Sequence, residues 1–142
     1  MSTKPSIRVA AAVVSRGNRF LLTLRPDGGH MAGYWEFPGG KVEPDETSEQ
    51  ALRRELREEL GVELGYLHAL TTFEHEYELR HVHLEFFKTE IVAGVPRPLE
   101  VAALGWFTSC QMPRLPLLPA DVPLIQLLER RQPGDGHEEE KS

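Results

Sequence analysis

Three glutamates near the middle of the chain have the spacing to hold one metal ion. Glu55, Glu58 and Glu59 stand at i, i+3 and i+4, so on a helix their carboxylates share a neighbouring face. Like charges so close repel each other unless a cation lies between them. A hard divalent ion prefers oxygen ligands, and Mg²⁺ is the commonest when the substrate carries phosphates. The alternative is a solvated acidic face supported by the nearby arginines Arg53, Arg54 and Arg57.

A helix over residues 48–60 is expected to position these glutamates. Thr47 and Gln50 have the spacing of a capping box, which marks the start of a helix. Gly61 stands where a helix end favours a residue that tolerates positive φ. Apolar residues recur every four positions, which predicts one stripe that packs on the core: Leu52, Leu56 and Leu60.

The spacing around this helix resembles the Nudix box in full. Gly40 is followed after five residues by Glu46, and after seven more by Arg54-Glu55-Leu56. One residue later comes Glu58-Glu59, and after one more comes Gly61-Val62. Many fixed residue types at fixed spacing make this a specific signal. The resemblance implies hydrolysis of a nucleoside diphosphate linked to another moiety.

The resemblance also implies roles for individual residues. It implies a metal site made of the backbone carbonyl of Gly40 and the carboxylates of Glu55, Glu58 and Glu59. It implies that Arg54 and Glu46 form a supporting pair that orients these carboxylates, because a carboxylate holds a metal well only when its rotamer is fixed. Mg²⁺ is the expected ion, with Mn²⁺ as a possible substitute.

Composition limits the classes of protein to which this chain can belong. The chain has 142 residues, which suits one domain, and no apolar run of membrane-spanning length. With Cys110 as its one cysteine and no signal peptide in its N-terminal residues, a cytoplasmic location is expected. The formal net charge is −6, without the basic patch that a nucleic-acid polymer would need. We expect a single domain over residues 1–131 and a disordered acidic tail over residues 132–142.

The remaining elements are read from hydrophobic periodicity and turn residues. We expect a second helix over residues 121–131, with Asp121 as its N-cap. Strands and one acidic helix, followed by more strands and a terminal helix, predict an α/β fold, and the resemblance implies an α/β/α sandwich with a mixed sheet. The expected strands cover residues 7–15, 18–25, 66–77, 80–92 and 104–107, and the resemblance implies a further short strand at 34–40.

The segment from His30 to Lys41 resembles the MutT branch of the family, which cleans the nucleotide pool and so protects DNA. That branch hydrolyses nucleoside triphosphates to the monophosphate and pyrophosphate, and its best-known substrates carry 8-oxoguanine. The resemblance implies that Glu100 is a further glutamate of the metal site or the base. It also implies a nucleotide pocket formed by Arg25, His30, Phe37, Arg80 and Val82, and Lys41 or Arg25 is expected to neutralise the leaving pyrophosphate.

One position departs from the MutT pattern. Asp121 stands where that pattern reads the base with an asparagine, and an ionised aspartate only accepts hydrogen bonds. It suits the amino and ring N–H donors of guanine, although it repels O6 of guanine unless it is protonated, and it also suits the exocyclic amine of cytosine. Residues 118–123 are closer to the CTP pyrophosphohydrolase relatives, which also accept modified dCTP. Asp121 could also be only a helix cap.

Several further alternatives stay open at this point. The substrate could be another nucleoside diphosphate-linked compound, or the chain could be a nucleotide-sensing module on the same scaffold. Glu55 or Glu100 could be the general base. The histidines on the two long strands, His75, His81 and His83, could suggest a transition-metal site, although such pairs are usually exposed polar residues. The chain could be a monomer or a homodimer.

Overall fold

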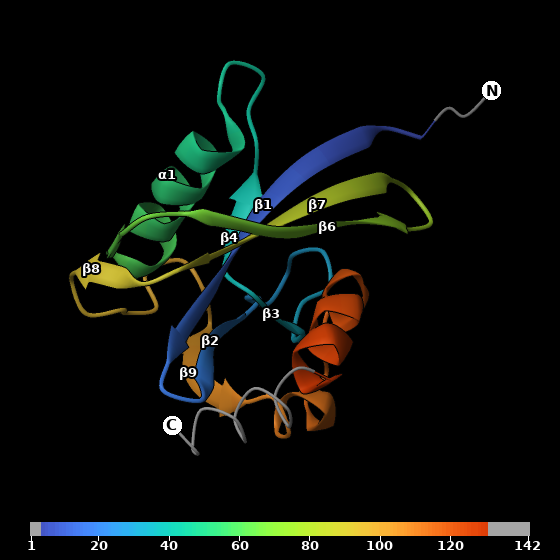
Figure 1. Cartoon of the computed structure of the whole chain (residues 1–142). Coiled ribbons are helices and arrows are strands. Elements are labelled where there is room, and N and C mark those ends of the chain that lie inside the picture. Colours follow the sequence, from blue (N-terminus) through green and yellow to red (C-terminus); the bar gives the residue numbers. More distant parts are fainter. Residues whose placement is uncertain (1–3, 131–142) are drawn as a thin grey trace.

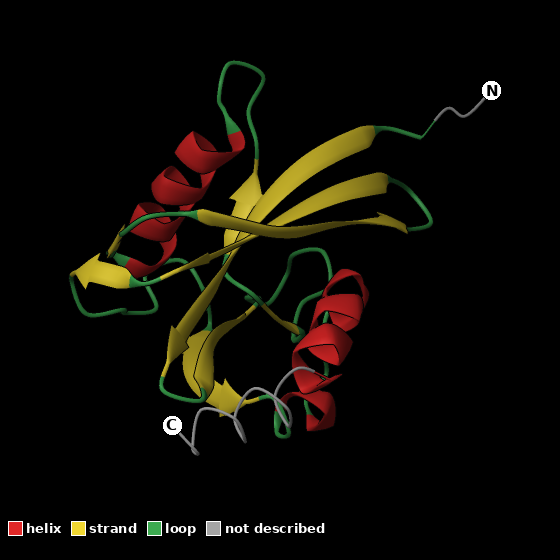
Figure 2. Cartoon of the chain, in the orientation of Figure 1, coloured by secondary structure: helices red, strands yellow, loops and turns green. Residues whose placement is uncertain are grey.

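The computed structural model describes residues 4–130. The expected acidic tail over residues 132–142 and the last residue of the expected C-terminal helix therefore lie outside the described residues. The chain is a mixed α/β structure, as the sequence predicts, with strands gathered between two helices (Figures 1 and 2). Its elements in chain order are β1 (Ser6–Arg16), β2 (Arg19–Leu24), β3 (Trp35–Glu36), β4 (Gly39–Lys41), α1 (Ser48–Leu60), β5 (Glu63–Leu64), β6 (His68–Glu76), β7 (His81–Thr89), β8 (Ile91–Ala93), β9 (Ala103–Thr108), the 3₁₀ turns Met112–Arg114 and Pro119–Asp121, and a helix over residues 122–130.

β1 is the strand around which the sheet is built. It pairs in parallel with β7 and antiparallel with both β2 and β4, so the sheet is mixed. β6 continues the sheet beyond β7, and β2 carries β3 and β9. β5 and β8 form a separate two-stranded ribbon. β1 therefore lies between the glycine strand β4 on one edge and the long strands β7 and β6 on the other.

The two faces of β1 support two separate hydrophobic clusters. Ala10, Ala12 and Val14 pack with the apolar stripe of α1. The alternate residues Ala11 and Val13 pack in the other cluster, which contains residues of the C-terminal helix. Side chains of a strand alternate between the two faces of the sheet. Because β1 is buried on both faces, its sequence is one continuous apolar run. Figure 1 shows α1 and the C-terminal helix on opposite sides of the strands.

α1 begins and ends where the sequence predicts. Thr47 is the N-cap, and its side chain accepts a hydrogen bond from the backbone N–H of Gln50. The Gln50 side chain accepts in turn from the backbone N–H of Thr47, which completes the capping box. Gly61 ends the helix with φ of 72°, in the left-handed region where a glycine carries no steric penalty.

The structure differs from the expected strands after α1. The strand expected to begin at residue 66 begins at His68, and the ribbon strand β5 was not expected. The long strand expected over residues 80–92 divides into β7 and β8. The carbonyl of Glu90 accepts a hydrogen bond from the backbone N–H of Gly65, so the chain leaves the main sheet there and pairs with β5 instead.

The start of the C-terminal helix also differs from the expectation. Asp121 closes the 3₁₀ turn Pro119–Asp121, and helical residues follow from 122. The Asp121 carboxylate accepts a hydrogen bond from the backbone N–H of Phe37 at 2.9 Å, across the structure. The prediction that Asp121 is the N-cap was therefore wrong, because its side chain is held by a residue distant in sequence.

Thr23 provides a test of the packing around β2. Its side chain is 1% exposed, and its Oγ1 has no hydrogen-bond partner within residues 4–130. An unpaired buried hydroxyl destabilises a protein, so Thr23→Val is expected to raise the free energy of unfolding by about 1 kcal/mol, or the Tm by about 3 °C. Thr89→Val is the matched control. The Thr89 hydroxyl is also buried but donates to the Glu90 carbonyl, so this variant should not gain stability. A lower Tm for Thr23→Val would contradict the prediction.

Candidate active site

A cavity of about 400 Å³ opens between the strands, the glycine strand β4 and the end of α1. Its apolar wall comes from β1 and β7, and its polar lining comes from α1, loops and strand ends. Most of the residues proposed from the sequence lie in this one cavity, although they come from all parts of the chain. They are Arg25, His30, Phe37, Gly40, Lys41, Glu55, Glu59, Arg80, Val82, Glu100 and Asp121.

Gly40 brings backbone and carboxylate into contact at the cavity wall. It pairs with Ala10 of β1, and a Cβ added to it would lie 2.2 Å from the carboxyl carbon of Glu55. A side chain at this position would therefore displace Glu55. The close approach places one carboxylate directly against the backbone of β4, as a site with mixed carbonyl and carboxylate ligands requires.

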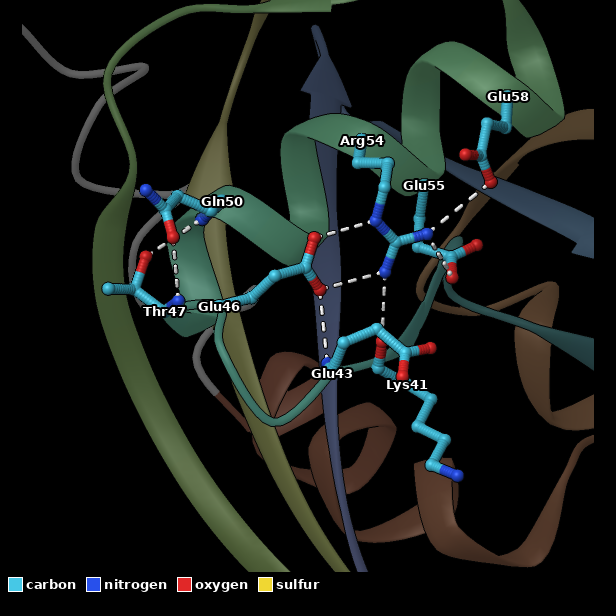
Figure 3. Close-up of polar contacts among 8 residues, drawn as sticks. All are labelled: Lys41, Glu43, Glu46, Thr47, Gln50, Arg54, Glu55 and Glu58. Carbon is cyan, nitrogen blue, oxygen red and sulfur yellow. Dashed lines mark hydrogen bonds and ion pairs between the residues drawn. The ribbon is translucent and has the colours of Figure 1, made fainter.

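Arg54 connects three glutamates through one guanidinium group (Figure 3). Its Nε and one terminal nitrogen donate to the two carboxylate oxygens of Glu46, at 2.7 and 2.9 Å. Its other terminal nitrogen donates to Glu55 at 3.1 Å and to Glu58 at 3.4 Å. The hydrogen bond from Arg54, together with the backbone N–H of Glu43, lowers the pKa of Glu46 to about 2. Glu46 is therefore a permanent anion that holds the guanidinium in place.

Ionisation of Glu59 carries a large electrostatic cost in this site. Burial raises the pKa of its carboxyl to about 9, and the neighbouring Glu55, Glu36 and Glu100 add to the shift. A divalent cation among these groups would offset both the repulsion and the loss of solvation. The donor set therefore fits a hard divalent ion, with carboxylates from α1, Glu100 and the backbone of Gly40 as its available oxygens.

Glu58 does not line the cavity. Its side chain is half-exposed and lies against Arg54, so it would have to turn inward to reach an ion held by Glu55 and Glu59. Across residues 4–130, no group of three or more acidic, histidine or cysteine side chains already converges as a complete coordination shell. The site has the right donors, and Arg54 limits how its carboxylates can move.

None of the three histidines of the long strands is among the residues that line the cavity. Both ring nitrogens of His81 contact carboxylates, from Glu74 and Glu76, and His83 contacts Glu74 as well. These carboxylates raise the pKa of His81. The ring of His75 packs against Tyr77. His81 and His83 thus take part in a charged surface network on β6 and β7, and neither side chain lines the cavity.

Glu46 offers a test of the supporting pair. Glu46→Gln removes the charge that fixes Arg54, so the carboxylates of Glu55 and Glu58 should lose their fixed rotamers. Loss of such a supporting partner typically weakens metal binding or activity about 10–100-fold. We therefore expect the Mg²⁺ concentration that gives half-maximal activity to rise about 10–100-fold. Glu49→Gln is the matched control, because Glu49 is an exposed glutamate of the same helix. Equal behaviour of the two variants would refute the role of the pair.

A second carboxylate pair lies deeper in the cavity. Arg25 donates to Glu36 at 2.8 Å. Burial raises the pKa of the Glu36 carboxyl, and the ion pair with Arg25 offsets only part of this rise. Asp121 is 3% exposed, and burial raises the pKa of its carboxyl well above the usual range, with the charge of Glu36 acting in the same direction. One Asp121 oxygen accepts from the backbone N–H of Phe37. Its other oxygen has no hydrogen bond within the described residues.

Sequence reasoning missed two polar residues of this cavity, Glu36 and Tyr77. Glu36 alternates with Trp35 in the short strand β3, so a carboxylate between apolar neighbours was the available signal. The Tyr77 hydroxyl accepts from the backbone N–H of Ala120, and the Tyr77 ring packs edge-on against His30. Nothing in the sequence near Tyr77 indicated these distant contacts.

The sequence profile described as NUDIX domain matches residues 9–127, which is most of the chain. The chain belongs to the Nudix family. Nudix hydrolases generally need a divalent metal ion, in agreement with the oxygen-rich donor set described above. Across residues 4–130, no helix is long and apolar enough to cross a membrane.

Known relatives carry two different names at similar identity. The chain is 42% identical over 120 residues to CTP pyrophosphohydrolase of Escherichia coli (strain K12), covering 84% of this chain and 89% of that protein. It is 44% identical over 88 residues to 8-oxo-dGTP diphosphatase of Proteus vulgaris, covering 61% and 79%. The crystal structure of a MutT Nudix hydrolase from Burkholderia pseudomallei superposes with a TM-score of 0.79 at 31% identity, over 87% of this chain and 98% of that one. The fold agrees, and identity alone does not choose between the names.

Proposed function

We propose that this Nudix chain hydrolyses nucleoside triphosphates to the monophosphate and pyrophosphate, with Mg²⁺ as the metal. The observation that carries the proposal is the single cavity that joins the box residues Gly40, Glu55 and Glu59 to the base-side residues Arg25 and Asp121. A nucleotide placed there would have its phosphates beside the carboxylates and its base beside Asp121. The printed names of the relatives describe reactions of this class.

The residues of the chain would hold and orient this substrate. Gly40, Glu55, Glu58, Glu59 and Glu100 would hold the metal, which would neutralise the phosphates and lower the pKa of a bound water. Arg54 and Glu46 would keep the carboxylates oriented. The cations at the cavity wall, Lys41 and Arg25, would balance negative charge on the phosphates; Arg80 and His30 lie in the same cavity near the base-side residues.

The general base must be a carboxylate near the attacking water. Glu55 is held by Arg54 at 3.1 Å, which fixes its carboxylate and suits a ligand. Glu100 has no hydrogen bond or ion pair within the described residues, so its carboxylate stays available to accept a proton. We propose Glu100 as the base on this ground. Its replacement by Gln should then raise the Mg²⁺ requirement and also lower kcat at saturating Mg²⁺, whereas the loss of a pure ligand should be overcome largely by excess Mg²⁺.

The base-side geometry supports a guanine base over cytosine. One Asp121 oxygen already accepts from Phe37, and burial raises the pKa of the carboxyl well above its usual range, which favours its protonated form. The other oxygen then presents an O–H donor to the cavity. A donor matches O6 of guanine and opposes the amino group of cytosine. We therefore propose 8-oxo-dGTP as the preferred type of substrate, with nucleotide-pool sanitation as the role. CTP and modified dCTP are the second candidates, for which Asp121 would have to ionise.

Pyrophosphate release with Mg²⁺ across a substrate panel tests the proposal. The panel is 8-oxo-dGTP, dGTP, CTP, dCTP and 5-methyl-dCTP, compared by kcat/KM. A preference for 8-oxo-dGTP supports the proposed substrate, and a preference for the cytidine compounds assigns the chain to the second candidate. Products other than pyrophosphate and monophosphate would indicate a different diphosphate substrate, such as a nucleotide sugar. Tight nucleotide binding without turnover would favour a sensing module.

We further propose that residues 1–131 act as one domain in the cytoplasm, as a monomer or a homodimer, on a small-molecule nucleotide. Mn²⁺ is expected to substitute for Mg²⁺, since both accept carboxylate oxygens. Light scattering of the purified protein would give the oligomeric state.

A further inference from the structure

The loop between β8 and β9 is attached to the end of α1 by its backbone. The N–H of Arg97 donates to the carbonyl of Leu60 at 3.0 Å, and the N–H groups of Leu99 and Glu100 donate to the carbonyl of Glu59 at 2.9 and 3.3 Å. The last carbonyls of a helix have no partner within the helix. Here the loop supplies these partners, so it follows the C-terminal end of α1 closely.

Gly94 lies where this loop first meets the helix end. Its φ is 89°, in the left-handed region. A Cβ added to it would lie 2.6 Å from the carbonyl oxygen of Gly61 and 3.3 Å from the Cα of Val62. Both atoms belong to the backbone, so neither can rotate away. The contact between the loop and the end of α1 therefore requires the absence of a side chain at position 94.

Glu100 depends on this attachment for its position. The other carboxylates of the site that stand next to Arg54 are held through their side chains. Glu100 lines the cavity but makes no side-chain hydrogen bond or ion pair within the described residues. Its location is set by its backbone, which is bonded to Glu59, another residue of the cavity. A shift of the loop would move Glu100 away from Glu59.

We propose that Gly94 is a positioning residue, which keeps the loop seated on α1 and so places Glu100 beside Glu59 in the metal site. The proposal rests on the proposed function, because it assumes that Glu100 acts in that site. Gly94 itself lies outside the residues that line the cavity. Its effect must therefore pass through the loop.

Gly94→Ala tests the proposal against a matched glycine. Gly17 also has a left-handed φ, of 64°, but a Cβ there meets nothing within 4 Å. Both substitutions strain the backbone, and only the first one adds a clash with the end of α1. We expect Gly94→Ala to raise the Kd for Mn²⁺, measured by calorimetry, about 10-fold or more, and to lower kcat/KM with Mg²⁺. Gly17→Ala should change neither quantity. An unchanged Kd for Gly94→Ala would overturn the proposal.

A double-mutant cycle shows whether Gly94 acts through Glu100. The Gly94→Ala and Glu100→Gln changes are made singly and together, and Kd and kcat/KM are measured for each protein. Coupled residues give non-additive effects, so the double variant should be no worse than Glu100→Gln alone. Additive losses would mean that Gly94 only supports the fold and would refute the positioning role.

Two measurements keep the test decisive. If Gly94→Ala does not fold, Gly94→Asn replaces it, because Asn tolerates a left-handed φ but still carries the clashing Cβ. Thermal unfolding of every variant shows which proteins are folded. If the unaltered chain releases no pyrophosphate from any substrate, the proposed function fails. The Mn²⁺ titrations still report whether Gly94 places Glu100.

Discussion

Glu59→Gln is expected to lower kcat/KM with Mg²⁺ by more than about 100-fold. Loss of a residue that only supports a metal ligand typically costs about 10–100-fold, and a ligand itself should cost more. Glutamine keeps the shape of glutamate but removes one negative charge from the cavity. Glu55→Gln should behave similarly, because Glu55 lies against the backbone of Gly40.

The same substitution is expected to stabilise the metal-free protein. Burial and the carboxylates of Glu55, Glu36 and Glu100 raise the pKa of Glu59 to about 9. Near neutral pH, folding of the metal-free chain must therefore either protonate Glu59 or bury its charge, and both lower stability. Glutamine removes this cost, so the Tm measured in EDTA should rise while activity falls. Opposite signs for stability and activity are typical of a residue kept for function. A simple structural glutamate would give losses in both.

Glu43→Gln is the control for these variants. Glu43 is an exposed glutamate in the segment between Gly40 and Glu46, and its substitution makes the same change in charge. It should leave kcat/KM and the Mg²⁺ requirement unchanged. If Glu58→Gln and Glu59→Gln both kept full Mg²⁺-dependent turnover, the assignment of the metal site would be wrong.

Local chemistry made α1 predictable from sequence. Its cap, its apolar stripe and its terminal Gly61 all act within one or two turns, and the observed bounds Ser48–Leu60 agree with the prediction. The ribbon of β5 and β8 was not predictable in the same way. Its strands are two and three residues long, too short for a periodic pattern, and they form because Gly65 and Glu90 meet across the chain.

The residues of the candidate site also fall into two groups, those that local sequence predicts and those that depend on distant contacts. The box residues were found because their spacing is local, and the roles assigned to them remain predictions. Glu36 and the contact between Asp121 and Phe37 depend on residues that are distant in sequence. Asp121 lies next to a helix, so a capping role was reasonable from the sequence. Only the folded chain shows that its carboxylate is 3% exposed and bonded to the backbone before β4.

Asp121→Asn is expected to keep kcat/KM for 8-oxo-dGTP within about 10-fold, whereas Asp121→Leu should lose about 100-fold. Asparagine can accept from the N–H of Phe37 with its oxygen and present its NH₂ donors to the cavity, as the neutral carboxyl does. Leucine has a similar size but leaves that N–H and the base unpaired, which costs about 1–3 kcal/mol. If the second candidate function holds, Asp121 must ionise, and Asp121→Asn would lower kcat/KM for CTP as strongly as Asp121→Leu.

The pH dependence of stability tests the protonation of Asp121 independently of any substrate. Burial raises its pKa well above the usual range, so the folded state holds this proton more tightly than the unfolded state does. The contribution to stability is then fully present below the unfolded pKa of about 4 and is lost as the pH rises through the folded value. Asparagine does not titrate. The Tm of Asp121→Asn minus that of the unaltered chain should therefore increase from pH 4 to pH 8. A constant difference would mean that Asp121 is ionised in the folded protein. Its carboxylate would then have no O–H donor to offer O6 of guanine, and the argument for a guanine substrate would fail.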